Sequence, residues 1–386
     1  LTLLGKNHHH VAASYNQMAL LYRDNGEFKK ALDYHKKALS IYQNAFGENH
    51  LLVGHTYGFI GSHYQKQNLY AKAQANFLKA LNIQRHNLGD NHPYVSWVYT
   101  QMGRLAFDQN NIDEALNCAQ NAIMALILNF NDPNWYINPA MTNVLNEKYM
   151  LNALKLKALA LKKRYQHISH DLKDLESALS TYQIIIGLIE QIHNQYQYES
   201  SKLLLNEETQ EIYDGALGTA LLLYTLTQKN HYKNRAFDLI EKAKSSVLLT
   251  SLQDSKARQF AGIPETLLNR EKALRIDLTF YETQIQNELQ KKGGPDSLKI
   301  KIYENKRFTL NEAYQKMIKD FEKDYPKYFH LKYQTGTVST TELQNHLDPE
   351  SVLIEYFLGS KNITIFTVAQ NHLDVFDIPV DTSFQK

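Results

Sequence analysis

Cysteine, proline and glycine are all scarce in this sequence of 386 residues. The single cysteine, Cys118, excludes an internal disulfide and any metal site built from several cysteines. Eight prolines and 16 glycines are few for this length and favour helix. The longest apolar run, 215–226, is far shorter than the roughly 20 residues that span a bilayer. A net charge of +2 lacks the basic excess typical of nucleic-acid-binding domains.

What is present fits an ordinary globular chain. Hydrophobic residues make up 43% and charged residues 21%, and the length predicts two or three folded units. The sequence begins at Leu1 without a signal-type segment, so we expect a soluble piece of a longer polypeptide. The lack of disulfide-forming cysteines favours the cytoplasm as its compartment.

A repeat of 42 residues is the clearest internal signal. A motif that ends in Gly-polar-Asn-His occurs at 4–8, 46–50 and 88–92, and small residues follow each copy with steps of 12 and then 7. A small residue lets a neighbouring helix approach closely, so each copy is predicted to be a helical hairpin that stacks on the next. The small residues are Ala19, Ala31 and Ala38, then Gly61, Ala73 and Ala80, then Gly103, Ala115 and Ala122.

The residues at the ends of these segments fit a helical hairpin. The turns 24–26 and 109–111 contain Asn or Gly, which tolerate left-handed conformations. Gly47 and Gly89 are expected to end the second helix. Asn49 and Asn91 are expected to cap the helix that follows, with Pro93 in its first turn.

This pattern resembles the tetratricopeptide repeat, in the long 42-residue form of kinesin light chains. The resemblance covers residues 1–130 and implies an α-solenoid. The shared register of the Asn-His pairs indicates that histidines 8–10 are native helix-start residues rather than a tag.

Beyond residue 130 the repeat degrades, because 132–135 and 138–139 contain prolines. Segment 131–254 is predicted to hold degenerate hairpins, with helix 151–165 paired to 172–192 and helix 207–227 paired to 234–252. Segment 255–335 is predicted to be a linker of two long helices with a turn at 292–296. The apolar seam of its first helix is Leu274, Leu278, Tyr281, Ile285 and Leu289.

Segment 336–386 changes to the alternation typical of strands, at 352–358, 363–368 and 373–378, which predicts a three-stranded meander. After degenerate repeats and a helical hairpin, the sequences 353–359 and 363–368 resemble the opening strands of the CHAT domain, a caspase-like module attached to tetratricopeptide repeats. The resemblance covers about 236–386 and implies that 336–386 is the truncated start of such a domain. The predicted fold class is therefore mostly α: an α-solenoid, a helical linker and a short β-meander.

In the CHAT family a His–Cys dyad performs proteolysis, and both residues lie downstream of these strands. No catalytic residue can be assigned here, so this chain is predicted not to be an enzyme, although its parent protein is a candidate cysteine peptidase. Cys118 is predicted to be a packing residue. His167 and His170 have the spacing of two zinc ligands but lack further ligands, and histidines 8–10 offer at most adventitious affinity for nickel or zinc. We therefore predict neither a metal site nor a cofactor.

The predicted binding surface is the concave face of the solenoid, which the resemblance assigns to the first helix of each hairpin. Amide side chains there can pair with a peptide backbone, arginines with carboxylates, and aromatic rings can anchor apolar groups. The alternative is that these residues only solvate the face or pack against the C-terminal part of the chain. The twelve residues are Asn16, Gln17, Leu20, Arg23, His55, Phe59, Ser62, Lys66, Trp97, Thr100, Gln101 and Arg104.

We therefore expect a solenoid that binds a protein or peptide and serves as the sensor or recruitment arm of a caspase-like protease, with the linker transmitting the signal. The alternative is a non-catalytic scaffold that assembles protein complexes. We expect neither a nucleic acid nor a membrane as partner, and self-association is left open.

Overall fold

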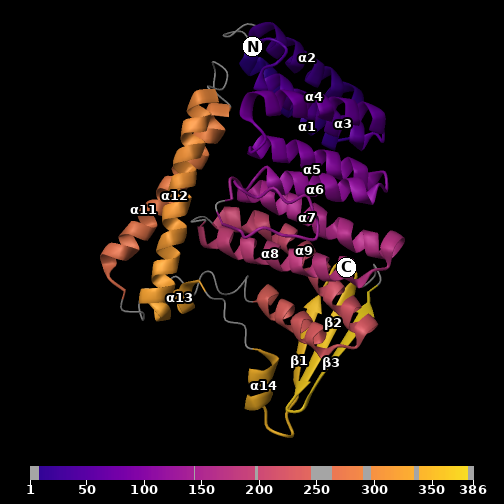
Figure 1. Cartoon of the computed structure of the whole chain (residues 1–386), viewed down its shortest axis with the longest axis vertical. Coiled ribbons are helices and arrows are strands. Elements are labelled where there is room, and N and C mark those ends of the chain that lie inside the picture. The colour runs from indigo at the N-terminus through magenta and orange to yellow at the C-terminus, as the bar shows by residue number, and fades with distance from the viewer. Residues whose placement is uncertain are drawn as a thin grey trace. The chain divides into compact units, whose positions relative to one another are not determined.

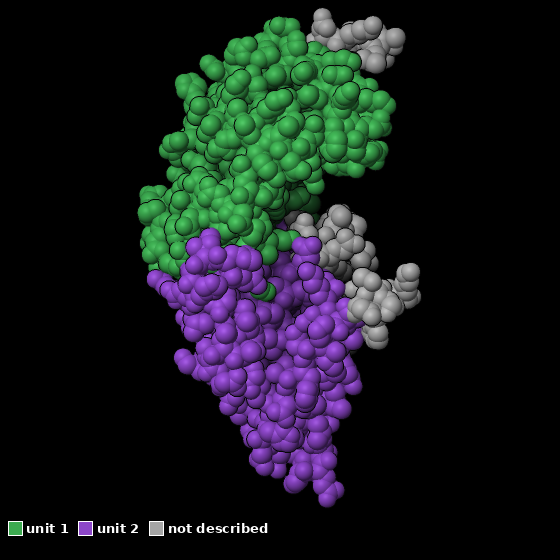
Figure 2. Space-filling view, turned by 90° about the vertical axis from the view of Figure 1, so that its right-hand side faces the viewer, with its two compact units in different colours: residues 1–164, 276–313 green, residues 165–275, 314–386 purple. Residues whose placement is uncertain are grey.

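The computed structural model describes residues 8–142, 144–195, 199–244, 263–289, 297–333 and 339–380. These residues are mostly helical, and three strands lie near the C-terminal end (Figure 1). Contacts divide the chain into two compact units (Figure 2). Unit 1 comprises residues 1–164 and 276–313, and unit 2 comprises 165–275 and 314–386. The boundary at 164 falls inside the predicted segment 131–254, and the four predicted segments stay a prediction.

Unit 1 contains the three predicted helical hairpins, stacked in chain order (Figure 1). Neighbouring hairpins contact each other through α2 with α3 and through α4 with α5, and α7 (Glu147–Arg164) packs on α5 and α6. This is the predicted solenoid arrangement. The hairpins are α1 (His9–Asp24) with α2 (Phe28–Phe46), α3 (Leu51–Lys66) with α4 (Tyr70–Leu88), and α5 (Pro93–Asp108) with α6 (Ile112–Met124).

The small residues of the repeat lie at helix contacts, as predicted. The seven alanines among them have no exposed surface. A Cβ atom added at Gly61 would lie 2.7 Å from the ring of Phe77, and one added at Gly103 would lie 2.6 Å from Leu156. Any larger side chain at these positions would push the helices apart.

The predicted helix ends are confirmed at their glycines and prolines. Gly47 and Gly89 end α2 and α4 with φ of 86° and 81°. In the turns, Gly26 has φ of 78° and Asn110 has φ of 61°. Pro93 is the first residue of α5. These backbone conformations favour glycine or asparagine, which is why those residues mark the breaks between helices.

The predicted N-caps are wrong by one residue, because the histidines and not Asn49 and Asn91 cap the helices. The Nδ1 atom accepts a hydrogen bond from the backbone N–H two residues later, at 3.4 Å for His8, 3.2 Å for His50 and 3.1 Å for His92. Nδ1 is bonded to Cγ, as is the Oδ1 atom of asparagine, so imidazole can occupy the same capping position.

The predicted helix break after α6 is confirmed, and residues 125–146 form a loop with a bridge between Ile127 and Val144. Lys157 of α7 is fully buried against this loop. Its ammonium donates to Gln120 Oε1 at 2.9 Å, to the Ile137 carbonyl at 2.9 Å and to Asn138 Oδ1 at 2.8 Å. Burial lowers the pKa of Lys157 to about 7. No pattern in the sequence pointed to this contact.

Unit 2 begins with the π-helical turn η1 (Tyr165–Ser169) and continues with α8 (Leu172–Gln195), α9 (Glu199–Thr227) and a helix over 230–244. The predicted helices at 172–192 and 207–227 are confirmed, and residues 245–252 of the last predicted helix lie outside the described residues. The predicted pairing of 151–165 with 172–192 would join the two units and stays a prediction.

The predicted linker helices are α11 (Glu265–Leu289) and α12 (Ser297–Asp324), followed by α13 (Pro326–Lys332). Ile285 of the predicted seam is buried, whereas the turn at 292–296 and the side chain of Leu289 lie outside the described residues. In unit 2, Glu271 accepts hydrogen bonds from Tyr328 at 2.7 Å and Tyr333 at 2.8 Å. None of the helices in the described ranges is both long and apolar enough to cross a membrane.

The predicted meander is confirmed. The strands β1 (Leu353–Leu358), β2 (Asn362–Ala369) and β3 (His372–Pro379) form an antiparallel sheet in the order β1-β2-β3. The short helix α14 (Thr340–His346), which the sequence analysis missed, precedes them and starts with a capping box at Ser339. The sheet packs on unit 2 helices through Phe366 against Phe237, with ring centroids 5.5 Å apart.

Candidate functional site

The twelve predicted binding residues lie on α1, α3 and α5. Ten of them are exposed or partly exposed, and Asn16 and Thr100 are buried. The solenoid register therefore placed most of these residues where a partner can reach them. The prediction failed at one position of the 42-residue repeat. This position is residue 16 in the first copy, residue 58 in the second and residue 100 in the third.

Asn16 is buried between helices, contrary to the prediction. Its Oδ1 accepts a hydrogen bond from His35 Nδ1 at 2.9 Å, and its Nδ2 donates to Thr56 Oγ1 at 3.1 Å. Thr56 in turn donates to the Leu52 carbonyl at 2.8 Å. These bonds fix the orientation of the amide and place the proton of His35 on Nδ1. The amide of Asn16 thus joins α1 to α2 and α3 and is not offered to a ligand.

Thr100 is also buried and donates to the Ser96 carbonyl within α5 at 2.9 Å. The residue at this offset in the second copy, Gly58, explains why. A Cβ atom at Gly58 would lie 2.4 Å from the indole of Trp97, so this offset lies under the next hairpin. The glycine at position 58 was a signal in the sequence that could have excluded Asn16 and Thr100.

Four aromatic side chains form a continuous surface over α3 and α5, which we call the aromatic strip: His55, Phe59, Tyr94 and Trp97. All four are partly exposed. Ring centroids of His55 and Tyr94 are 4.2 Å apart, and those of Phe59 and Trp97 are 5.8 Å apart, both in edge-to-face contact. The ring of His35 on α2 lies 6.0 Å from that of Phe59 and extends the contacts beneath the surface. The strip therefore connects two successive hairpins.

The imidazoles in and beneath the aromatic strip are uncharged at neutral pH. Burial lowers the pKa of His55 to about 4, and the neighbouring His92 and His50 lower it further. Burial likewise lowers the pKa of His35 to about 3, with smaller contributions from His63 and Arg23. The strip therefore presents aromatic surface without charge, which suits apolar side chains of a partner.

Charged and amide groups flank the aromatic strip. Arg23 pairs with Asp24 at 2.8 Å, and Arg104 donates to Asn152 Oδ1 at 2.8 Å. Lys66 is exposed, and Gln101 is partly exposed. A partner over the strip would meet apolar rings in the centre and polar groups at the border, the usual anatomy of a protein interface.

Within unit 1, α12 contacts the starts of α5 and α7. Nδ1 of His92 accepts the capping bond, so its Nε2 carries the proton and donates to Glu304 at 3.3 Å. Arg307 lies 3.6 Å from Glu147 and 3.2 Å from Glu282, and it also donates to the Leu145 carbonyl. These contacts hold α12 beside the Tyr94 end of the aromatic strip.

Burial changes the acidity of several groups at this contact. It raises the pKa of Glu147, an effect that the guanidinium of Arg307 opposes. It also raises the pKa of Tyr149 to about 12 and that of Tyr94 well above its usual range. A carboxylate that is buried in this way depends on its arginine partner.

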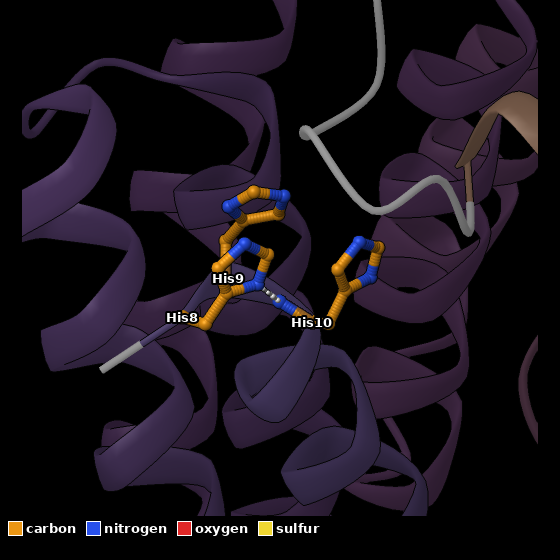
Figure 3. Close-up of side chains that lie close together, drawn as sticks. All are labelled: His8, His9 and His10. Atoms are coloured by element: carbon orange, nitrogen blue, oxygen red, sulfur yellow. Dashed lines mark hydrogen bonds between the residues drawn. The ribbon is translucent and has the colours of Figure 1, made fainter. Parts of the chain in front are cut away.

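Histidines 8–10 form a close group at the start of α1 (Figure 3). It is the one group of three potential metal ligands within the described ranges, with ligand atoms no more than 4.8 Å apart. The rings of His8 and His10 are nearly parallel, at 16°, whereas the nitrogen lone pairs must converge to bind one ion. Nδ1 of His8 is also occupied by its capping bond. His167 and His170 are exposed side chains at η1.

Cys118 is buried in α6, which confirms the predicted packing role. Its Sγ atom lies 3.6 Å from Glu114 Oε1. Burial, together with this carboxylate, raises the pKa of the thiol to about 12. Because the thiolate is the nucleophilic form of cysteine, this environment disfavours nucleophilic chemistry.

Comparison with known proteins identifies the repeats. Residues 10–85 and 53–123 match the model of the tetratricopeptide repeat family, two overlapping matches that cover the three hairpins. No curated protein matches the chain. The resemblance of 336–386 to a CHAT domain stays a hypothesis.

Several solved structures are similar to this chain. BtubC (BKLC) from P. vanneervenii is 16% identical with a TM-score of 0.36, and the match covers 45% of this chain and 62% of that one. Two structures of a putative kinesin light chain from Podosopora anserina with nearly identical TPR-like repeats also match. They are 13% and 15% identical, with TM-scores of 0.40 and 0.36, and cover 62% of this chain and 95% and 96% of theirs. At these scores the similarity carries no information on ligands.

Proposed function

We propose that unit 1 binds an extended segment of a partner protein across the aromatic strip. The observation that carries this proposal is a partly exposed, uncharged aromatic surface that joins two hairpins and is bordered by arginine, lysine and amide groups. Aromatic anchors with a polar border are typical of surfaces that bind peptides. The solenoid itself does not require four aromatic side chains to remain partly exposed.

The proposal can be tested with peptides selected from a random display library against the whole chain. Affinities measured by fluorescence anisotropy should fall at least about tenfold for Phe59→Ala, the effect of losing one aromatic anchor. Leu78→Ala is the control, because Leu78 is 42% exposed on α4 and lies outside the strip. If both variants bind the selected peptides as tightly as wild type, the strip is not the binding site.

We further propose that this binding surface recruits or senses partners for a caspase-like protease. We propose the cytoplasm as the compartment in which the protein acts. Two features support the link to a protease: the order of repeats, helical hairpin and meander, and the contact of α12 with the solenoid beside the strip. In the parent protein, a strip-binding peptide should then change the rate of peptide hydrolysis. An unchanged rate with saturating peptide would contradict the link to proteolysis and leave the binding proposal standing.

This chain by itself is proposed to lack peptidase activity. A peptidase assay should give no turnover, and Cys118→Ala should change nothing. Robust turnover that disappears in Cys118→Ala would contradict this part of the proposal.

The alternative is a scaffold that brings proteins together without controlling catalysis. It is favoured by a second exposed apolar surface, on the sheet of unit 2, which would give the chain two independent places of contact. A scaffold would bind the selected peptides with the same affinity and leave hydrolysis by the parent protein unchanged.

A further inference from the structure

The first part of α12 rests on the solenoid through a face that is mostly polar. Residues 297–313 of this helix belong to unit 1, as do the three hairpins. Four residues at spacings of three and four lie on one side of the helix, which we call the docked face. Three of them are polar, and the fourth is a buried isoleucine. The four residues are Ile300, Glu304, Arg307 and Asn311.

The most exposed apolar residues of the same segment lie on the opposite side of the helix. Leu298 and Ile302 are about half a helical turn away from the docked face, and they are 68% and 46% exposed. A surface helix normally turns its apolar side to the protein and its polar side to water. In this segment the arrangement is reversed, so the contact lacks the composition of a permanent helix packing.

Hydrogen bonds and ion pairs hold the docked face on the solenoid. His92 at the start of α5 donates to Glu304 at 3.3 Å. Arg307 lies 3.6 Å from Glu147 at the start of α7, and Asn311 donates to the same carboxylate at 3.2 Å. Arg307 is the one cation paired with this carboxylate in the described ranges of the chain. The contact of α12 with α7 therefore depends on a single guanidinium.

The contact reaches the aromatic strip at Tyr94. The ring centroid of Tyr94 is 5.2 Å from that of His92, whose Nε2–H group donates to α12. Burial raises the pKa of Tyr94 well above its usual range, and the nearby carboxylates of Glu304 and Glu282 contribute to the increase. These carboxylates belong to α12 and α11, so both helices stand next to the phenol of Tyr94. The docked face therefore closes this end of the strip.

We propose that the docked face of α12 is an autoinhibitory strap, which a partner must displace before it can use the whole aromatic strip. Displacement returns both partners of each polar pair to water, so the net cost is modest compared with opening an apolar core. Segments with few buried apolar contacts are the ones that open most readily. This inference rests on the proposed peptide site, because a strap has a function only where there is a ligand to exclude.

The test compares two charge reversals in the whole chain, Arg307→Glu and Lys306→Glu. The two variants have the same net charge, and Lys306 is exposed. Arg307→Glu places another carboxylate beside Glu147 and should undock the helix. Hydroxyl-radical footprinting should then show that Tyr94 is oxidised at least about threefold faster than in wild type. Lys306→Glu should leave the rate of oxidation unchanged.

Peptide binding measures the functional consequence. The probes are peptides selected from a display library against wild type and against Arg307→Glu, restricted to those that bind Phe59→Ala more weakly. Arg307→Glu should bind them at least about threefold more tightly than wild type, because the apparent Kd falls as the fraction of open molecules rises. Lys306→Glu should bind them as wild type does.

Glu304→Lys is a second release variant in case Arg307→Glu does not fold, as judged by circular dichroism. It removes the acceptor of His92 and should give the same two results. The inference alone is overturned if release leaves the oxidation of Tyr94 unchanged, or if Phe59-dependent peptides bind the release variants no more tightly than wild type. If no selected peptide depends on Phe59, the proposed peptide site is refuted and the strap with it.

Discussion

Acid should weaken unit 1, and the buried histidine His35 should make a large contribution to this loss. Its Nδ1–H donates to Asn16, and its Nε2 atom has no hydrogen-bond partner in the part of the chain that the structure describes. Protonation would place a second N–H group on this buried nitrogen with nothing to accept it. This is why burial lowers the pKa of His35 to about 3.

The magnitude follows from the difference between the folded and unfolded pKa values. The folded value of about 3 lies below the ordinary value of 6.5, so the unfolded state binds the proton first as pH falls. The contribution of His35 to stability is therefore complete above pH 6.5 and is lost progressively between pH 6.5 and 3. The loss is about 2 kcal/mol at pH 5 and about 4 kcal/mol at pH 3.

The assay is urea unfolding followed by tryptophan fluorescence between pH 7.5 and about 4.5. Both tryptophans of the chain, Trp97 and Trp135, belong to unit 1, so the signal reports that unit alone. His35→Asn keeps a donor at the position of Nδ1 but cannot be protonated. It should be less stable than wild type at pH 7.5, because the ring contacts are lost, and much less sensitive to acid.

The difference between wild type and His35→Asn is the decisive quantity, because other buried histidines contribute to the slope of both proteins. This difference should shrink by about 1.4 kcal/mol per pH unit below pH 6. His86→Asn removes an exposed imidazole on α4 and should keep the wild-type slope. Equal slopes for wild type and His35→Asn would refute the reasoning.

Three further substitutions test the packing of the chain, each by chemical denaturation or hydrogen exchange. Gly61→Ala should cost about 1–3 kcal/mol, because its methyl group meets a phenylalanine ring, whereas Gly187→Ala, which meets no atom within 4 Å, should be neutral or stabilising. His92→Ala should cost about 1 kcal/mol more than His92→Asn, which keeps the capping acceptor; equal losses would disprove the histidine cap. Arg307→Ala leaves two carboxylates without their partner and should speed hydrogen exchange in α12, whereas Lys306→Ala at the exposed neighbouring position should not.

Much of the fold could be predicted because its signals are local. The spacing of Ala19, Ala31 and Ala38 recurs in each copy, and a hairpin is formed by residues close in sequence. Gly47 and Gly89 mark helix ends because their backbone conformations exclude most other residues. The strands followed from the alternation of apolar and polar residues alone.

The features that could not be predicted depend on residues far apart in the chain. In the sequence, Lys157 is indistinguishable from an exposed charged residue of a helix. Its burial follows from three hydrogen-bond acceptors in α6 and the following loop, which are distant in sequence. Arg307 contacts both Glu282 and Glu147, and Glu147 lies 160 positions earlier in the sequence (307 − 147). No local pattern reports such a pairing.

The candidate site lies between these two cases. The register of the repeat placed ten of the twelve residues at exposed or partly exposed positions, but it could not separate a face that lies under the next hairpin from one beside it. Asn16 and Thr100 were misplaced for that reason. That the ten residues bind a partner stays a prediction. Tyr94, which the prediction omitted, became recognisable only through its contact with His55.

The aromatic strip is supported by more than one hairpin, and this has a mechanical consequence. His55 and Phe59 belong to one hairpin, and Tyr94 and Trp97 to the next. A small change of tilt between the hairpins therefore changes the distances between the rings, while each hairpin keeps its own structure. If the strip binds a partner as proposed, the bending stiffness of the stack helps to determine which ligands it accepts. A substitution deep in the contact between α4 and α5 could alter selectivity without touching a ligand.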